Sequence, residues 1–484
     1  MAVLEQLEPK GVFYFFEEIS KIPRGTYDMK RISDYCVSFA KERGLVVIQD
    51  EAYNVIIKKP GTKGYEDSEP VILQGHLDMV CVKTSDSNHD FKKDALDLYV
   101  EDGFVKARGT TLGGDNGIAI AYAMALIDSD DIPHPPIEAV FTADEEEGLV
   151  GAAKLDVSVL DGQMLINLDS SEEHMILAGC AGGFRQELKL PVRRVQKKDE
   201  SSRMELKIDG LRGGHSGGDI HEQRGNANKL IGRLLTVLHA KTSCLLVEVN
   251  GGSKDNVITT SAMAAVVVDR EHQEAALSIV SEMAETWKRE YGATEPELTL
   301  SAQTVSNDRL DPMGAECTER AIFLINCTPY GVQEFSRELE GIVETSLNLG
   351  VVTTDQDYVS AAFMVRSSAE SKLEEMQYTL TAWANHLKAE TTVSSSYPAW
   401  MYKVDSELRQ IMIETHKEVF GKEPIVTTIH AGLECGILSG KNPDLDCVSI
   451  GPNMYDLHSV DERMNIESVE RVWNYLKAVL ANCK

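Results

Sequence analysis

The apolar positions in the first part of the chain fall into two alternating patterns. Short continuous apolar runs begin at Pro70, Ile137 and Met164, and each has the length of a buried strand. Stripes at helical spacing cover residues 30–42 and the segment that begins at Gly117. Buried strands that alternate with helices are typical of a doubly wound, mostly parallel sheet. We therefore predict an α/β domain whose functional groups gather where the strands end.

Further along the chain the pattern changes to amphipathic strands and longer helices. Residues 202–305 read strand, helix, two strands, helix and strand, which is the order of a ferredoxin-like unit. A similar order recurs less regularly in residues 317–393, so a duplicated unit is one option. We predict that an α+β domain is inserted into the α/β domain. The predicted boundaries are 1–186 with 397–484 for the α/β domain and 187–396 for the insertion.

Composition narrows the class of protein. The 484 residues carry 48 Lys and Arg against 77 Asp and Glu, which gives a formal net charge of −29. Such an excess of carboxylates repels phosphate backbones, so we expect no nucleic-acid partner. Hydrophobic residues make up 43% of the chain, which argues against a protein that is disordered throughout.

Cysteine usage and the N-terminus indicate the compartment. The nine cysteines are scattered and contain no Cys-x-x-Cys pair, which is typical of a reducing compartment. The N-terminal apolar run covers only residues 12–16 and is followed by two glutamates, so no signal-peptide core is predicted. No segment approaches the roughly 18 apolar residues of a membrane helix. We expect a soluble cytoplasmic protein with no membrane partner.

Polar side chains stand where the predicted strands end. His76 and Asp78 lie two residues apart and can therefore point the same way, as in a metal-bound imidazole that a carboxylate orients. His-x-Asp is a common triplet, and alone it indicates little. Asp115 lies among glycines in a loop that leads into a helix, so its carboxylate could project into a cleft or cap the helix.

Four consecutive acidic residues, 144–147, follow the predicted strand that begins at Ile137. On a solvated face such a run is ordinary, but at the end of a buried strand the mutual repulsion of the carboxylates requires a cation. Asp169 ends another predicted strand, and His458 lies in a loop near the C-terminus. Together these strand ends supply the nitrogen and oxygen ligands of a two-metal hydrolytic site with a bridging carboxylate.

The chain resembles the aminoacyl-histidine dipeptidases (peptidase D, carnosinase-like), within the di-zinc peptidase clan that also holds aminoacylases and carboxypeptidase G. The resemblance runs nearly from end to end. It is carried by the pair of glutamates and by HLDMV, ARGTTLGGDNG, INLDSSE, GCAGG, GLRGGHSGGDIH, GNANK, ETSLNLGVV, HAGLECG, VSIGP and HSVDE. This combination is far more specific than any one of its pieces.

The resemblance implies a complete catalytic centre with two divalent ions, zinc first and manganese or cobalt as alternatives. Asp115 would bridge the ions, Asp78 would orient His76, and Glu145 would be the general base that takes the proton of the attacking water. The implied metal ligands are His76 and Asp169 for one ion, Glu146 and His458 for the other, and Asp115 for both.

In the family that the chain resembles, the corresponding motif is similar to Thr-Glu-Glu-x-Gly, and the glutamate run of this chain departs from it. Asp144 replaces the threonine, and Glu147 occupies the variable position, so three consecutive glutamates leave the register open. Anchoring the pattern on Gly148 selects Glu145 as the base and Glu146 as the ligand. Elsewhere Gly114 replaces an alanine and Val460 a proline, and these changes remove no functional group.

On the inserted domain, the resemblance assigns His215 to stabilise the developing oxyanion, so this domain would close over the substrate as a lid. Without the resemblance, His215 would be an incidental residue of a glycine-rich turn. Arg366 is the candidate for the free carboxylate of the substrate because a guanidinium holds a carboxylate bidentately, although a surface ion pair is an alternative. Cys180 has no evident activating base, which favours packing over a nucleophilic role. The resemblance also implies that the pocket for the substrate carboxylate is lined by Asn256, His430, Gly432 and Glu434.

The sequence thus predicts a di-zinc exopeptidase that cleaves dipeptides of the Xaa-His type, such as β-alanyl-histidine. The alternatives are an N-acyl-amino-acid deacylase or a tripeptidase of the same clan, and a metal-free peptide-binding or scaffold protein. A homodimer formed through the lid domain is expected. Whether His215 serves its own chain or its partner's stays open.

Overall fold

The computed structural model describes residues 3–198, 200–306 and 309–484. The chain divides into two compact units. Unit 1 comprises residues 1–180, 400–428 and 433–484, and unit 2 comprises 181–399 and 429–432. Among the described residues, no helix combines the length and apolar character needed to cross a membrane.

Unit 1 is built around a sheet of eight strands. In spatial order these are β1 (Val46–Gln49), β2 (Val55–Lys59), β6 (Ile137–Thr142), β3 (Val71–His76), β7 (Met164–Asn167), β19 (Asp446–Ser449), β8 (Met175–Cys180) and β18 (Ile425–Ile429). The four central strands, from β6 to β19, pair in parallel, whereas β2 and β8 pair with them antiparallel. The predicted α/β class is confirmed, with the parallel part confined to the centre of the sheet.

Helices and a small second sheet complete unit 1. The helices are α1 (Lys10–Ile19), α2 (Lys30–Glu42), α3 (Gly114–Asp128), α4 (Val150–Lys154), the short 3-10 turn 157–159, α9 (Glu407–Phe420), α10 (Glu434–Lys441) and α11 (Ile466–Asn482). The small sheet runs β20 (Met454–Tyr455), β21 (Arg463–Asn465), β5 (Phe104–Ala107) and β4 (Leu98–Glu101).

Apolar cores on both faces of the main sheet explain the continuous apolar runs of the sequence. Every residue of β3 and β6 is buried. Val71 and Leu73 belong to the core that includes α1, α3 and α11, while Ile72 belongs to a separate core with α4 and α10. A strand buried on both faces needs apolar side chains at successive positions rather than at alternate ones. The polar residues can then follow only where the strand ends.

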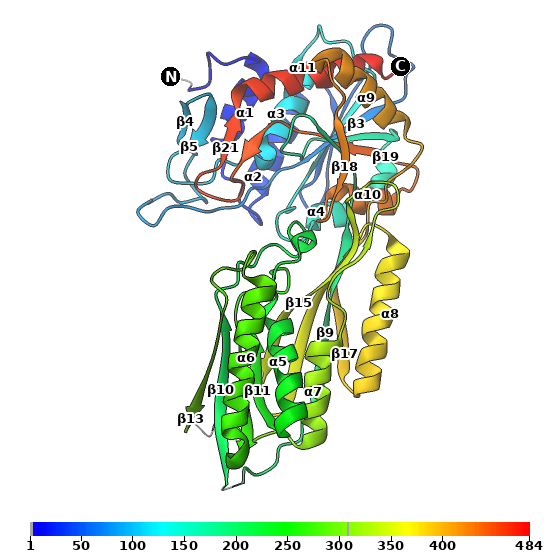
Figure 1. The fold of residues 1–484 in the computed structure, drawn as a ribbon. Helices are drawn as coiled ribbons and strands as arrows, with labels where there is room; N and C mark the ends of the chain where they lie inside the picture. The colour runs from blue at the N-terminus through cyan, green and yellow to red at the C-terminus, as the bar shows by residue number, and fades with distance from the viewer. Residues whose placement is uncertain (1–2, 199, 307–308) are drawn as a thin grey trace. The chain divides into compact units, whose positions relative to one another are not determined.

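Unit 2 contains a nine-stranded sheet in which every described pairing is antiparallel. Its strands in spatial order are β13 (Thr299–Val305), β10 (Ser201–Asp209), β12 (Ala262–Asp269), β11 (Leu245–Gly251), β15 (Val343–Thr354), β16 (Tyr358–Ser367), β9 (Gly182–Pro191) and β17 (Glu390–Tyr397), with β14 (Gly331–Phe335) paired to β15. Its helices are α5 (Ala227–Thr242), α6 (Gln273–Tyr291), α7 (Ala315–Cys327) and α8 (Glu370–Leu387), and short 3-10 turns cover 220–222 and 270–272. In Figure 1, α6, α5 and α7 lie side by side in front of these strands.

The strand order identifies two ferredoxin-like halves in unit 2. The first half follows β10, α5, β11, β12, α6 and β13 along the chain, and its strands lie in the order fourth, first, third, second. The second half, made of β9, α7, β15, β16, α8 and β17, repeats that order. The first half is nested between β9 and α7 of the second. The inserted α+β fold and its duplication are therefore confirmed.

Candidate functional site

The parallel strands of unit 1 bring the polar residues to one edge of the sheet. His76 is the last residue of β3 and pairs in register with Thr142, the last residue of β6. The glutamate run follows β6 closely, and Asp169 follows β7, which pairs with β3 on its other side. Because the strands are parallel, their carboxyl ends lie side by side, as expected for a site at the end of such a sheet.

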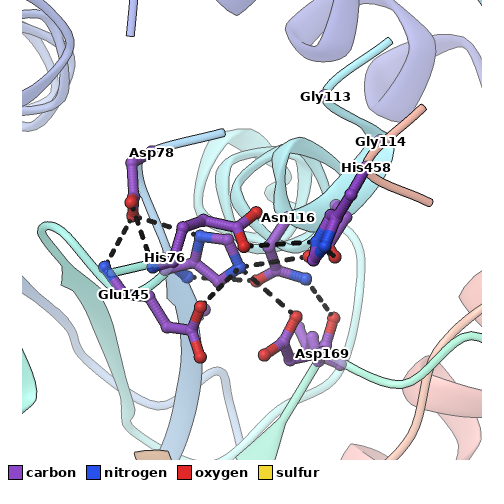
Figure 2. A network of polar contacts seen from close by, with 12 residues as sticks. His76, Asp78, Gly113, Gly114, Asn116, Glu145, Asp169 and His458 are labelled. Atoms are coloured by element: carbon purple, nitrogen blue, oxygen red, sulfur yellow. Dashed lines mark hydrogen bonds and ion pairs between the residues drawn. The ribbon is translucent and has the colours of Figure 1, made fainter. Parts of the chain in front are cut away.

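Asp115 lies between two imidazoles. The Nε2 atom of His76 is 3.1 Å from Asp115 Oδ1 and 3.5 Å from Asp169 Oδ1. The Nε2 atom of His458 is 3.1 Å from the other Asp115 oxygen and 3.2 Å from Glu146 Oε2. Figure 2 shows both imidazoles pointing into this cluster from separate segments of the chain. One carboxylate thus offers an oxygen to each of two ligand sets.

The residues fit two divalent cations. Three groups have ligand atoms within 4.8 Å of one another: His76 with Asp115 and Asp169, Asp115 with Glu146 and His458, and His76 with Glu145 and Glu146. The first two share Asp115, so together they can hold two ions. Imidazole nitrogens and carboxylate oxygens are ligands that zinc and similar ions accept. Among the described residues, Glu146 Oε1 is buried without a hydrogen-bond partner, a costly state that a cation would relieve.

The electrostatics show how strongly this cluster attracts positive charge. Hydrogen bonds to Asp115 and Glu146 raise the pKa of His458 to about 10. Burial acts to lower the pKa of His76, but Asp169 and Asp115 outweigh burial and raise it well above its ordinary value. Burial and the neighbouring Asp115 raise the pKa of Asp169 to about 7. In the absence of metal, protons therefore supply the positive charge that the carboxylates need.

Asp78 holds the base candidate and the first imidazole in place. It is fully buried, and its Oδ1 lies 3.3 Å from His76 Nδ1, on the side of the ring opposite the ligand cluster. The same carboxylate accepts hydrogen bonds from the backbone N–H groups of Glu145 (2.9 Å) and Glu146 (3.2 Å). A carboxylate behind a ligating imidazole fixes its orientation and raises its basicity.

Glu145 belongs to the third group, with His76 and Glu146, and to neither of the two groups that share Asp115. Its Oε2 is 3.9 Å from His76 Nε2. Burial raises the pKa of Glu145 well above its ordinary value, with Asp169 and Glu434 adding to the effect. A raised pKa makes a carboxylate a better proton acceptor near neutral pH. The position and environment suit a general base.

The backbone around the glutamate run explains its departure from the family pattern. Gly148 has a φ of 101°, which favours glycine, so the residue used to anchor the register is required by the turn. Asp144 also has a positive φ, and its Oδ1 accepts a hydrogen bond from the backbone N–H of Tyr27 at 2.6 Å. The carboxylate of Asp144 is thus engaged in loop structure.

Glu434 belongs to unit 1 and lies in a buried polar network. Its Oε2 accepts hydrogen bonds from Gln74 (2.5 Å) and Thr142 (2.6 Å), both on strands that lead to the metal ligands. Burial raises the pKa of Glu434 to about 7. Its Oε1 is buried and has no partner among the described residues. A substrate contact by Glu434 stays a prediction.

Unit 2 brings His215 and Arg366 together. The Nδ1 atom of His215 accepts hydrogen bonds from the backbone N–H groups of Gly217 (3.3 Å) and Gly218 (3.0 Å), so the proton of the neutral ring lies on Nε2. That Nε2 is 3.4 Å from Arg366 Nη2. Burial and the charge of Arg366 lower the pKa of His215 and keep its ring neutral. Two donors that converge in this way are suited to an anionic or carbonyl oxygen.

The remaining predicted residues of unit 2 surround this pair. His430 Nε2 lies 2.7 Å from Ser346 Oγ, and Ser346 pairs in register with Arg366 across two strands. Burial and Arg366 lower the pKa of His430 to about 3. Asn256 accepts a hydrogen bond from the backbone N–H of Ser216, next to His215, through its carbonyl oxygen. Unit 2 thus gathers His215, Asn256, Arg366 and His430, and Gly432 lies against Tyr397 in the same cluster.

Tyr397 is a residue of this cluster that sequence reasoning missed. Its hydroxyl accepts a hydrogen bond from Arg366 Nη1 at 2.8 Å. A Cβ atom at Gly432 would lie 2.9 Å from the Tyr397 ring, and one at Gly183 would lie 2.7 Å from its hydroxyl. The glycines of GCAGG and HAGLECG therefore make room for this tyrosine. In the sequence, only these glycines indicate that a bulky group packs closely here, and they do not identify residue 397 as that group.

Other supporting residues of unit 1 were also missed. Asn116 accepts a hydrogen bond from the backbone N–H of His76 and donates one to the carbonyl of Leu168, next to Asp169. Arg24 and Glu462 hold the backbone around Asp115. Glu462 ends the segment HSVDE, which was a usable signal, whereas Arg24 has no distinctive sequence context. Cys180 is buried, and burial raises its thiol pKa to about 11, as expected of a packing residue.

Comparisons with known proteins find similar chains and solved structures. Residues 72–482 match the model of peptidase family M20/M25/M40. The cytosol non-specific dipeptidase of Escherichia coli is 39% identical over 482 residues, 99% of each chain. The crystal structure of aminoacylhistidine dipeptidase from Vibrio alginolyticus has a TM-score of 0.93 at 37% identity, covering 99% of this chain and 98% of that one. An aminopeptidase of Bacillus cereus, with a TM-score of 0.57 and 14% identity over 99% of both chains, shares the fold. The resemblance recognised in the sequence motifs is confirmed.

Metal binding is expected to release protons. Both imidazoles have raised pKa values and are protonated at pH 7 in the metal-free protein, whereas a metal ligand must be a neutral imidazole. Loading with zinc at pH 7 should therefore release about two protons per chain from the imidazoles and a further fraction of a proton from Asp169, whose pKa is about 7. Affinity should rise with pH up to the pKa of His458, which is about 10. Calorimetric titration in buffers of different ionisation enthalpy measures the number released.

The exposed His386 of unit 2 offers a matched control. His386→Ala should leave the proton release unchanged, while His458→Ala should reduce it together with the number of ions bound. Zinc binding without any proton release at pH 7 would contradict the electrostatic description of the site.

Proposed function

Since the chain belongs to peptidase family M20/M25/M40, we propose that it is a metal-dependent dipeptidase that cleaves dipeptides, including Xaa-His dipeptides such as β-alanyl-histidine. The observation that carries the proposal is the position of Asp115, which presents one carboxylate oxygen to each of two histidines. The names of two similar proteins, a cytosol non-specific dipeptidase and an aminoacylhistidine dipeptidase, support the substrate class.

The five proposed ligands would hold two ions that share one carboxylate. The ligands are His76, Asp115, Glu146, Asp169 and His458. We propose zinc, with manganese and cobalt as alternatives, because two imidazoles with carboxylates suit these ions. Bound divalent ions acidify a shared water and polarise the scissile carbonyl, which is the chemistry that peptide hydrolysis needs.

Glu145 is proposed to move the proton. Its carboxylate lies beside the ligand cluster and has a raised pKa, so it can take a proton from the attacking water and deliver it to the leaving amine. Asp78 contacts both the backbone of Glu145 and the ring of His76, so it fixes the position of the proposed base relative to the proposed ligand. This arrangement supports the predicted division of work between Glu145 and Glu146.

Unit 2 is proposed to supply the groups that bind the substrate. His215, held as the Nε2–H tautomer, would donate a hydrogen bond to the developing oxyanion, and Arg366 would bind the free carboxylate. These donors can act only on a substrate that is held at the catalytic residues of unit 1. We therefore propose that unit 2 serves as a lid. Asn256, His430, Gly432 and Glu434 complete the proposed pocket.

Two further parts of the proposal concern the cellular setting. We propose that the protein works in the cytoplasm, which agrees with the name of the E. coli relative and with nine free cysteines. A homodimer formed through unit 2 follows from the family resemblance, with His215 acting in its own chain or in its partner's.

A substrate panel tests the proposed function. β-Alanyl-histidine and other dipeptides should be hydrolysed, whereas N-acetyl-histidine, a tripeptide and a dipeptide amide should react at least about tenfold more slowly. N-acetyl-histidine lacks the free amino group of a dipeptide, the tripeptide is one residue longer, and the amide lacks the free carboxylate that Arg366 would bind. A chelator should abolish turnover, and zinc, manganese or cobalt should restore it. Faster hydrolysis of N-acetyl-histidine or of the tripeptide would replace the dipeptidase with a deacylase or a tripeptidase. Turnover that survives complete metal removal would refute the mechanism.

Three adjacent glutamates allow a sharp test of the roles. Glu145→Gln should keep two ions per chain but reduce kcat on the order of 10²–10⁴-fold, because it removes the base alone. Glu146→Gln should lower the affinity for metal, since it removes a ligand. Glu147→Gln, at an exposed neighbouring position, is the matched control and should change neither. If the first two results are exchanged, the assignment of base and ligand is off by one residue.

A further inference from the structure

The loop that leads to Asp115 is held from one side by a buried carboxylate. Glu462 is only 4% exposed. Its Oε2 accepts hydrogen bonds from the backbone N–H groups of Leu112 (2.8 Å) and Gly113 (3.0 Å). Its Oε1 accepts hydrogen bonds from those of Gly114 (2.9 Å) and Asp115 (3.3 Å). One side chain thus fixes four successive peptide groups that end at the proposed bridging ligand.

A buried guanidinium holds the same loop through its carbonyl side. Arg24 is 1% exposed, and its Nη2 donates a hydrogen bond to the carbonyl of Gly113. Its Nη1 donates to the carbonyls of Leu77 (3.1 Å) and Asp78 (2.9 Å), directly after His76. Arg24 therefore connects the segment that carries His76 to the loop that carries Asp115.

Two glycines make room for this guanidinium. A Cβ atom at Gly117 would lie 2.6 Å from Arg24 Nη2, and a Cβ atom at Gly113 would lie equally close. Gly113 also has a φ of 64°, which favours glycine. The glycines around Asp115 are thus explained in part by the side chain they accommodate.

Both charges are expensive to bury. Among the described residues, Arg24 forms no ion pair, and burial lowers its pKa although the nearby Glu462, Asp78 and Asp115 act to raise it. Buried charges of this kind often cost more than they contribute to folding. Each is bonded mainly to backbone atoms next to proposed metal ligands, which indicates a function in the geometry of the metal site.

We propose that Arg24 and Glu462 are positioning residues that set the distance between His76 and Asp115 and thereby the affinity of the dinuclear metal centre. Without them, the repulsion among the carboxylates would drive the Asp115 loop away from the cluster. Residues that orient metal ligands typically contribute 10–100-fold to metal affinity. The inference rests on the metal centre of the proposed function and not on the identity of the substrate.

Metal affinity measured on the full chain tests the contribution of Glu462. Glu462→Gln keeps the size of the side chain but turns donor N–H atoms toward backbone N–H groups, so the Kd for Zn²⁺, measured by chelator competition, should rise about 10–100-fold. Glu138→Gln is the matched control, because Glu138 is also buried and accepts hydrogen bonds from the backbone N–H groups of Asp161 and Gly162, away from the ligands. It should leave the Kd within about threefold of wild type, although both variants lose thermal stability.

The contribution of Arg24 is tested through the glycine that accommodates it. Gly117→Ala should raise the Kd for Zn²⁺ and alter the visible absorption of the Co²⁺-loaded protein, since it displaces the guanidinium. Gly11→Ala is the control, because Gly11 is also helical and its Cβ would make an ordinary contact of 3.5 Å with Ala125. Arg24→Lys, which keeps the charge but not the three-carbonyl geometry, decides the question if Gly117→Ala does not fold.

The possible outcomes separate the two proposals. If wild type binds two ions and the variants bind them as tightly as the controls do, the positioning role is refuted while the proposed function stands. If wild type itself binds no zinc, manganese or cobalt, the proposed function fails. Weakened metal binding in Glu462→Gln and Gly117→Ala, with normal binding in both controls, supports the positioning role of Arg24 and Glu462.

Discussion

The repulsion among carboxylates at one edge of a buried sheet governs the organisation of this protein. Asp115, Glu145, Glu146 and Asp169 converge there with two imidazoles. The carboxylates raise the pKa values of both histidines against the effect of burial, and burial raises that of Asp169, so the cluster holds protons. Divalent ions neutralise the same charges more completely than protons can. Metal binding would thus relieve the repulsion among the carboxylates that the fold brings together.

The rest of unit 1 keeps that unfavourable arrangement in place. Parallel pairing aligns the ends of β3, β6 and β7, and strands buried on both faces form a rigid platform. Hydrogen bonds that Asp78 accepts then fix the backbone of the glutamate run, and those that Glu462 accepts fix the loop of Asp115. Such preorganisation costs stability in the metal-free protein but avoids rearrangement when the ions bind. A functional side chain is preorganised in unit 2 as well, since two backbone N–H groups select the tautomer of His215.

Sequence reasoning reached the fold class and the clustered residues because both depend on local patterns. Runs such as the one from Pro70 reveal strands buried on two faces, and each ligand candidate follows such a run or a glycine turn. The limits of the parallel region were not predictable, since the antiparallel pairing of β2 and β8 depends on long-range contacts. The second ferredoxin-like half was recognised only in part, because its first strand, β9, precedes the entire nested half. Tyr397 and Arg24 were missed because their partners are distant in sequence and leave only glycines as a trace.

The proposed mechanism requires that two divalent ions share the carboxylate of Asp115. Anomalous diffraction at the zinc edge from crystals of the zinc-loaded protein tests it most directly. Two peaks are expected in each chain, one among His76, Asp115 and Asp169 and the other among Asp115, Glu146 and His458. A single peak, or two peaks of which only one contacts Asp115, would contradict it.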